Sequence, residues 1–135
     1  PVIANGEIWN LEDALRCLRE SGCDSLMLGR GMVTDPGLAL TIVAHLQAAV
    51  EHRTVQWHDL SPLLQVYWDL VSGHVVPKYR SGRLKQCLNF LRRRYPEAQE
   101  AYDAIRTLND SREVESWLDQ HAQPHPHRSE AALAA

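Results

Sequence analysis

The stretches PVIANGEI at residues 1–8 and SLMLGRG at residues 25–31 decide the fold of the first part of this chain. Each is an apolar run, at 1–4 or 25–28, that stops at a glycine-containing loop and leads into a helical pattern. Apolar strands that alternate with amphipathic helices are typical of a parallel sheet covered by helices. We therefore predict two strand–loop–helix units in residues 1–50.

Both loops have the composition of an anion site at the end of a strand. Glycine lets a ligand approach the backbone closely, and N–H groups at the start of the following helix favour an anion. In an eightfold α/β barrel, which needs about 250 residues, the loops after the last two strands are the usual phosphate site. Because the sequence begins directly on a strand at Pro1, we expect the last two βα units of a TIM barrel and the C-terminal piece of a larger protein.

The composition predicts a globular protein without membrane segments. Hydrophobic residues make up 44% of the chain, and no apolar run approaches the roughly 20 residues of a membrane span. Cys17, Cys23 and Cys87 lack metal-ligand spacing and favour a reducing cytoplasm. We expect them to pack rather than to catalyse, and we predict no metal site, because the histidines at 121–127 lack groups to orient them.

Basic charge is concentrated in residues 78–94. This stretch has seven Lys and Arg residues and no acidic residue, whereas the other 118 residues carry seven basic and seventeen acidic side chains, a formal charge of −10. A basic block on an acidic protein is the expected footprint of a surface that binds a polyanion. The alternative is an ordinary solvated helix face, which is more common for a generic run of charges.

Helical patterns cover most of the remaining sequence. Asn10 is a candidate N-cap for a helix that ends at Ser21-Gly22, and Asp35-Pro36 opens a helix to about Val50. After a linker at 51–57, four helices are expected. The first starts at Asp59 or Ser61 and ends at Ser72-Gly73, and the other three span 77–95, 97–108 and 111–120. Their short connections favour an antiparallel bundle. The tail at 121–135 is expected to be disordered.

The basic helix has three predicted faces at 3.6 residues per turn. One stripe should pack into the bundle, and basic residues line its two edges. The stripe is Leu84, Cys87, Leu88 and Leu91, one edge is Arg83, Phe90 and Arg94, and the other is Lys85 and Arg92. An aromatic ring between arginines suits nucleic acid, because it stacks on an unpaired base while guanidinium groups hold phosphates. The alternative for Phe90 is an ordinary residue at the core boundary.

The two loops also carry a family resemblance. Asn5-Gly6-Glu7-Ile8 and Ser21-Gly22-Cys23-Asp24, followed by Met27-Leu28-Gly29-Arg30-Gly31, resemble the last barrel repeats of the tRNA-dihydrouridine synthases, including the spacing between them. The later GRLKQCL at 82–88 and RTLN at 106–109 resemble the C subfamily, which modifies the uridine at tRNA position 16. The resemblance extends from Pro1 to about Gln120.

The resemblance implies an FMN site in the first part of the chain. Asn5, Gly6 and Glu7 would form one half of a cradle for the FMN phosphate and ribityl chain, and Gly29 and Arg30 the other. Arg30 would donate charge-assisted hydrogen bonds to the phosphate. By their residue types alone, Asn5-Gly6 is equally a turn, Arg30 a surface cation, and Glu7 a carboxylate at a helix entry.

The resemblance also implies a tRNA surface. Arg83, Lys85, Phe90 and Arg106 match the tRNA-binding signature positions of the C subfamily. Phe90 stands where tyrosine is more common, so it keeps the stacking ring but loses a hydroxyl group. Residues 51–120 would then be a C-terminal helical tRNA-binding domain that follows the barrel end at 1–50.

The implied reaction is the FMN-dependent reduction of a uridine to 5,6-dihydrouridine in the D-loop of tRNA, with NADPH as the reductant. The proton donor of the family is a cysteine on an earlier barrel loop, and none of the three cysteines here matches its motif. We therefore expect no catalytic residue in this chain and no activity of the chain alone. The resemblance further implies tRNA as the partner and a cytoplasmic location, with no membrane or obligate protein partner. Two alternatives stay open: a small-molecule FMN barrel oxidoreductase, and a stand-alone RNA-binding helical module.

The four tryptophans, at positions 9, 57, 68 and 117, are expected to be packing residues. For Trp9 the sequence leaves open whether the indole approaches the flavin or stays on the barrel rim.

Overall fold

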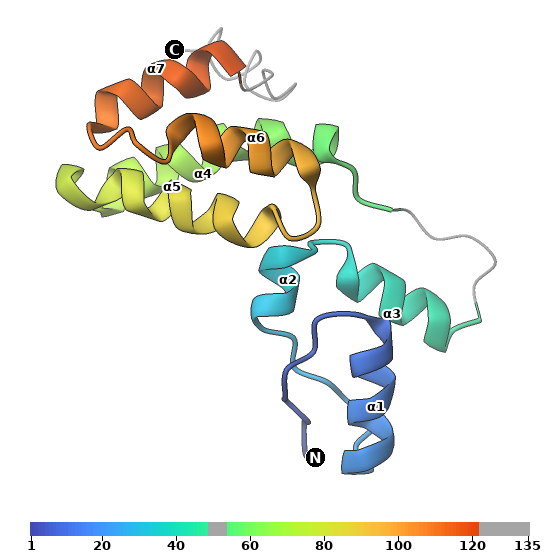
Figure 1. The fold of residues 1–135 in the computed structure, drawn as a ribbon. Coiled ribbons are helices and arrows are strands. Elements are labelled where there is room, and N and C mark those ends of the chain that lie inside the picture. Colours follow the sequence, from blue (N-terminus) through green and yellow to red (C-terminus); the bar gives the residue numbers. More distant parts are fainter. Residues whose placement is uncertain (49–53, 122–135) are drawn as a thin grey trace, which may run out of the picture. The chain divides into compact units, whose positions relative to one another are not determined.

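The computed structural model describes residues 1–48 and 54–121 (Figure 1). The chain divides into two compact units, the first spanning Pro1–Val55 and the second beginning at Gln56. Helices dominate both units. None of the helices in the described ranges is long and apolar enough to cross a membrane.

The first unit contains α1 (Leu11–Ser21), α2 (Arg30–Thr34) and α3 (Leu38–Leu46). The predicted ends of α1 are confirmed: Asn10 Oδ1 accepts a hydrogen bond from Asp13 N at 2.9 Å, and Gly22 ends the helix with φ 64°. A left-handed residue at a helix C-terminus is usually glycine, because a side chain strains the local backbone in that conformation. These caps are local, so the sequence alone specifies them.

The predicted strands 1–4 and 25–28 are extended segments rather than regular strands. One isolated parallel bridge joins Ala4 and Leu26, with hydrogen bonds of 3.0 Å from Ala4 N to Ser25 O and 2.8 Å from Met27 N to Ala4 O. Within the described ranges each segment has only the other as a neighbour, and a two-stranded pair is marginal by itself. The two segments therefore pair in the predicted parallel direction, but neither of them forms a regular strand.

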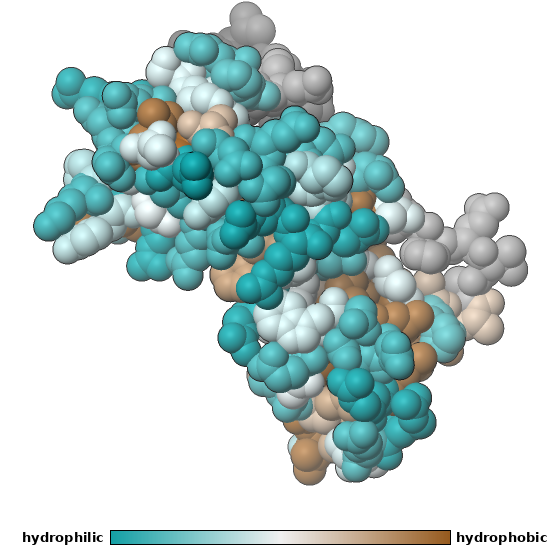
Figure 2. All heavy atoms as spheres, in the orientation of Figure 1, coloured by the Kyte–Doolittle hydropathy of each residue, from teal (hydrophilic) through white to brown (hydrophobic). Residues whose placement is uncertain are grey.

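Hydrophobic side chains reach the surface of the first unit (Figure 2). They come from both extended segments and from α3, and include Val2, Ile3, Met27, Leu40 and Val43. The buried core of this unit is small and consists of Ile8, Ala14, Leu38 and Ile42. A small core beside exposed apolar area explains why the two segments gain little from regular pairing.

The helix predicted to open at Asp35-Pro36 begins later. Asp35 is the C-cap of α2, and its Oδ1 accepts a hydrogen bond from Gly37 N at 2.9 Å. The carboxylate thus closes the turn between α2 and α3 instead of capping α3, which starts at Leu38. The expected end near Val50 lies outside the described residues; α3 ends at Leu46.

The second unit contains α4 (Trp57–His74), α5 (Pro77–Leu91), α6 (Pro96–Ile105) and α7 (Ser111–His121). The expected start of α4 at Asp59 or Ser61 is wrong. Gln56 is the N-cap, and Asp59 Oδ2 accepts a hydrogen bond from Gln56 N at 3.0 Å in a reciprocal capping box. The basic helix α5 ends at Leu91 rather than at Tyr95, and Pro96 is the first residue of α6.

Residues from all four helices form the core of the second unit. Helix α5 contacts α4, α6 and α7, and its predicted apolar stripe faces inward, with Leu84 and Leu88 at 0% exposure and Cys87 half-buried. The other side chains with at most 1% exposure are Trp68, Ala98, Ile105, Val114 and Leu118. The tail predicted to be disordered begins at His121, which is the last residue of α7; residues 122–135 lie outside the described ranges.

Candidate functional site

The two glycine-containing loops meet in one pocket of the first unit. All five residues expected in the FMN cradle, Asn5, Gly6, Glu7, Gly29 and Arg30, line a cavity of about 330 Å³. The parallel bridge between the extended segments places the ends of those segments side by side, and the loops follow directly. Residues 22 positions or more apart in the sequence are thereby brought together.

Arg30 and Glu7 form the electrostatic centre of this pocket. Arg30 Nη2 donates to Glu7 Oε1 at 2.5 Å, and Trp9 Nε1 donates to Glu7 Oε2 at 2.9 Å. The Arg30 and Glu7 side chains are 64% and 68% exposed, so the pair contributes little to stability. A guanidinium group has five N–H donors, so Arg30 retains donors for a second anion while Glu7 orients it.

Trp9 is a pocket residue whose role the sequence left open. Its indole lines the cavity, donates to Glu7, and lies 5.5 Å from the Arg30 guanidinium carbon, in cation–π range. No local sequence pattern predicts the contact between Trp9 and Arg30, because Arg30 comes from the other loop. The ring is therefore a support for the Glu7–Arg30 pair and not only a packing residue.

The backbone of both loops is held in a specific geometry. Glu7 has φ 42°, a left-handed conformation that costs energy in a non-glycine residue and clusters at functional sites. Gly31 is buried, and a Cβ there would lie well inside van der Waals contact of the Ile8 carbonyl oxygen. The two loops thus pack backbone to backbone at Gly31.

The pocket fits a phosphate-bearing group. A Cβ added at Gly6 or Gly29 would meet nothing within 4 Å, so the backbone at both positions is open to a ligand. Arg30 supplies a positively charged donor at the same pocket. The alternative for Glu7, a helix-entry carboxylate, does not describe this arrangement: α1 begins at Leu11, and Glu7 pairs with Arg30.

The four expected tRNA-binding residues lie on α5 and at the end of α6. Lys85 Nζ donates to Asn109 Oδ1 at 3.2 Å, which links α5 to the loop that begins at Arg106, the C-cap of α6. Arg83 is exposed, and its carbonyl oxygen accepts a 3.4 Å hydrogen bond from Tyr67 of α4. Residues two apart on a helix do not share a face, so Arg83 and Lys85 project from different edges of α5.

Phe90 and Arg106 have local partners. The Phe90 ring is half-buried, with the Arg93 guanidinium carbon 5.6 Å from its centroid. Arg106 Nε lies 3.8 Å from Asp103 Oδ1 in an exposed pair. The structure thus brings Lys85 to the α6–α7 loop, but no described contact joins Arg83 or Phe90 to Lys85 and Arg106.

Arg80 and Arg92, two of the basic residues in 78–94, connect helices of the second unit. Arg80 Nε donates to Val75 O at 2.7 Å and so satisfies a carbonyl group at the end of α4. Arg92 Nη1 donates to Gln99 Oε1 at 3.2 Å, and its guanidinium carbon lies 4.4 Å from the Tyr102 ring centroid on α6. The basic run is therefore part solvated surface and part helix packing, a distinction that charge counting does not reveal.

The three cysteines are free thiols with half-buried side chains. Cys17 packs against the core of the first unit. Burial raises the pKa of the Cys87 thiol, which disfavours the reactive thiolate. These surroundings agree with packing roles.

The sequence matches the dihydrouridine synthase family over residues 1–132. Three similar proteins are each called tRNA-dihydrouridine(16) synthase. That of Aquipseudomonas alcaligenes is 43% identical over 118 residues, 87% of this chain and 37% of that protein. Those of Pseudomonas putida and Escherichia coli K12 are 41% and 37% identical over 91% and 84% of this chain, respectively. The chain spans 34% to 38% of the length of these relatives. The chain belongs to the dihydrouridine synthase family.

Proposed function

We propose that this chain serves an FMN-dependent tRNA-dihydrouridine synthase, which reduces the C5–C6 double bond of uridine 16 in the D-loop of tRNA with NADPH. The observation that carries the proposal is the convergence of both family loops on one pocket, with Arg30 in its wall. The names of the relatives, which specify position 16 of tRNA, support the substrate.

In this proposal the first unit is the end of a TIM barrel. The extended segments 1–4 and 25–28 correspond to strands 7 and 8, and their parallel bridge is the pairing that such strands make. The apolar side chains at the surface of this unit support it, because barrel strands are buried on both faces. The second unit, α4–α7 in the described ranges, is the C-terminal helical tRNA-binding domain.

The pocket residues divide the task of holding FMN. Arg30 donates to the phosphate, Glu7 and Trp9 orient Arg30, and Asn5, Gly6 and Gly29 leave the backbone open for close approach. When bound, FMN would provide the hydride chemistry, in which a hydride from NADPH reaches C6 of the uridine. The family's proton-donating cysteine is not among Cys17, Cys23 and Cys87, so we propose that this chain has no catalytic residue and is inactive alone.

The tRNA surface comprises Arg83, Lys85, Phe90 and Arg106. Arg83 is exposed, and Lys85 is held by Asn109 beside the α6–α7 loop. We assign Arg83 to a phosphate contact. Phosphate contacts set the orientation of the tRNA, and the target uridine is extruded toward the flavin. The two edges of α5 would therefore contact different parts of the backbone.

The test uses the protein that contains this segment, with tRNA that lacks dihydrouridine. Arg30→Ala should weaken flavin binding, read from flavin absorbance after dialysis, by about tenfold, the lower end of the range for a charge-assisted hydrogen bond because Arg30 is largely exposed. Dihydrouridine at position 16 should fall in proportion. The matched control is Arg19→Ala, an exposed arginine on α1 outside the pocket. Unchanged flavin content in the Arg30 variant would refute the pocket assignment, and no dihydrouridine at position 16 from the unchanged protein would refute the activity.

A further inference from the structure

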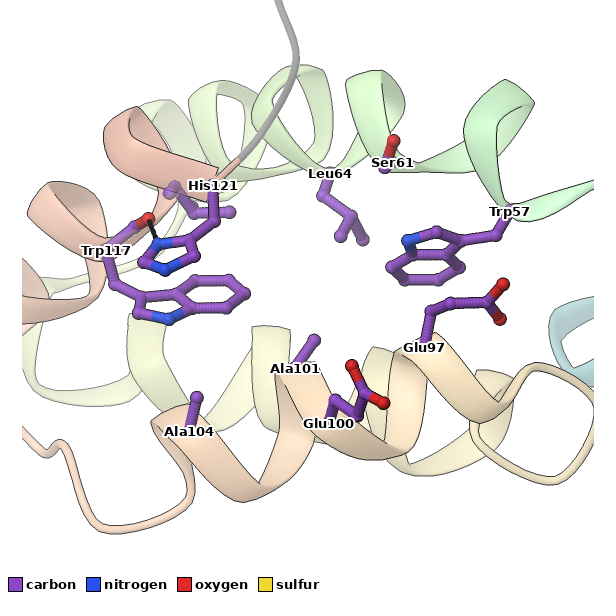
Figure 3. A pocket seen from close by; sticks show the side chains of 10 residues that line it. Trp57, Ser61, Leu64, Glu97, Glu100, Ala101, Ala104, Trp117 and His121 are labelled. Atoms are coloured by element: carbon purple, nitrogen blue, oxygen red, sulfur yellow. Dashed lines mark hydrogen bonds between the residues drawn. The ribbon is translucent and has the colours of Figure 1, made fainter.

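A second cavity of about 330 Å³ lies inside the second unit, between α4, α6 and α7 (Figure 3). None of the residues that line it belongs to α5, so it is separate from the basic surface. Its volume is at the lower end of the range, about 300 to 1,000 Å³, of small-molecule sites.

Aromatic rings form two walls of this cavity. Figure 3 shows Trp57 of α4 on one side and Trp117 of α7 on the other, with His121 beside Trp117. The Trp117 and His121 rings are stacked, with centroids 4.8 Å apart and planes 12° apart. The Tyr95 ring packs against Trp57, with 6.1 Å between ring centroids. These indoles were expected to be packing residues, but both are half-buried and border open space.

Two carboxylates lie along the α6 side of the same cavity. Glu97 and Glu100 are one helical turn apart, and both line the opening. Both residues are exposed, and within the described residues neither has a hydrogen bond or an ion pair. No Lys or Arg lines the cavity. The remaining charged or titratable lining group is His121, whose Nδ1 donates to Trp117 O at 2.8 Å. Its Nε2, in the neutral ring, is left as an acceptor.

We propose that this cavity binds an alkylammonium cation of the polyamine class, with spermidine as the probe. Indole faces attract ammonium groups, and the unpaired Glu97 and Glu100 give the cavity the complementary negative charge. Side chains three apart on a helix are separated by about 5 to 6 Å, which suits two ammonium groups joined by a short alkyl chain. The methylene groups of such a cation pack on the apolar floor that Leu64 and Ala101 provide. This site is additional to the proposed flavin and tRNA sites and does not depend on them.

The test is a titration of the whole chain with spermidine at moderate salt, followed by calorimetry and by the indole N–H signals in NMR spectra. The Trp57 and Trp117 signals, assigned with Trp57→Phe and Trp117→Phe, should shift, whereas that of the buried Trp68 should not. Glu97→Gln with Glu100→Gln should weaken binding by roughly fivefold to tenfold, since partly exposed ion pairs each contribute modestly. The matched control, Glu115→Gln with Asp119→Asn on α7, removes the same charge outside the cavity and should bind as the unchanged chain does.

Several results would overturn the proposal. One is equal weakening in the matched control, because the cation would then respond to the net charge of the chain. Another is equal binding of 1,8-octanediol, a neutral molecule of similar length, because the cavity would then be an apolar slot. Tight spermidine binding without shifts at Trp57 and Trp117 would place the cation elsewhere. Circular dichroism of each variant confirms that its helices are intact.

Discussion

Replacing Gly31 with alanine should disrupt the packing of the two pocket loops. The added Cβ would overlap the Ile8 carbonyl oxygen and lie only 3.1 Å from Ile8 C and from Leu38 Cδ2. Overpacking a core typically costs 1 to 3 kcal/mol, and we expect about 3 kcal/mol here because a backbone atom, rather than a flexible side chain, must move. For a unit of this size that corresponds to a fall in melting temperature of roughly 12 to 24 °C.

The assay is urea unfolding of the whole chain, followed by the indole N–H signal of Trp9 in NMR spectra, which separates Trp9 from Trp57, Trp68 and Trp117. Gly6→Ala is the control, because its Cβ would meet nothing within 4 Å and should change the free energy of unfolding by less than about 0.5 kcal/mol. Equal unfolding midpoints for the two glycine variants would refute the inference that the loops pack backbone to backbone.

Three further changes test other parts of the fold. Asn10→Ala removes the acceptor of Asp13 N and should lower the free energy of unfolding by about 1 kcal/mol in denaturant titrations. Leu84→Ala empties a fully buried position and should cost about 2 to 5 kcal/mol. Burial raises the pKa of Cys87 above its ordinary value of 9.0, so the unfolded thiol loses its proton first and stability should fall as the pH rises through that value; Cys87→Ser should reduce this dependence.

The following results would contradict these three predictions. An Asn10→Ala variant as stable as the unchanged chain would mean that α1 does not depend on its cap. If Leu84→Ala lowered the free energy of unfolding only slightly, α5 would be loosely packed at this position. Stability that rises with pH above 9.0, or that falls equally in Cys87→Ser, would contradict the buried thiol.

Helix ends were predictable where a residue of a favoured capping type stands at the end. Asn10 and Gly22 are such residues, and α1 begins and ends as expected, whereas the N-cap of α4 is Gln56. Asp35 and Asp59 misled the prediction because a carboxylate can serve as N-cap, as N3 partner or as the closure of a turn. Which role it takes depends on backbone geometry that the neighbouring residues do not specify.

The sequence predicted the two loops that line the pocket but not the contacts between them. The repeat of apolar run, glycine loop and helix located Asn5–Glu7 and Gly29-Arg30, but no local pattern states that Arg30 pairs with Glu7 or that Trp9 supports them. The sequence also grouped the basic residues of 78–94 as one surface, whereas Arg80 and Arg92 make helix contacts. Contacts between distant segments depend on the folded arrangement, which local sequence patterns do not encode.

The most direct test of the central proposal is a titration of the chain with an unmodified tRNA transcript at two salt concentrations. The unchanged chain should bind more weakly at higher salt. Arg83→Ala with Lys85→Ala should weaken binding and reduce the salt slope by about one for each phosphate group that is no longer neutralised. Arg16→Ala with Arg19→Ala, exposed arginines on α1 of the first unit, should leave both quantities unchanged. Equal weakening in the two double variants, or no binding by the folded chain, would contradict a tRNA-docking role for α5.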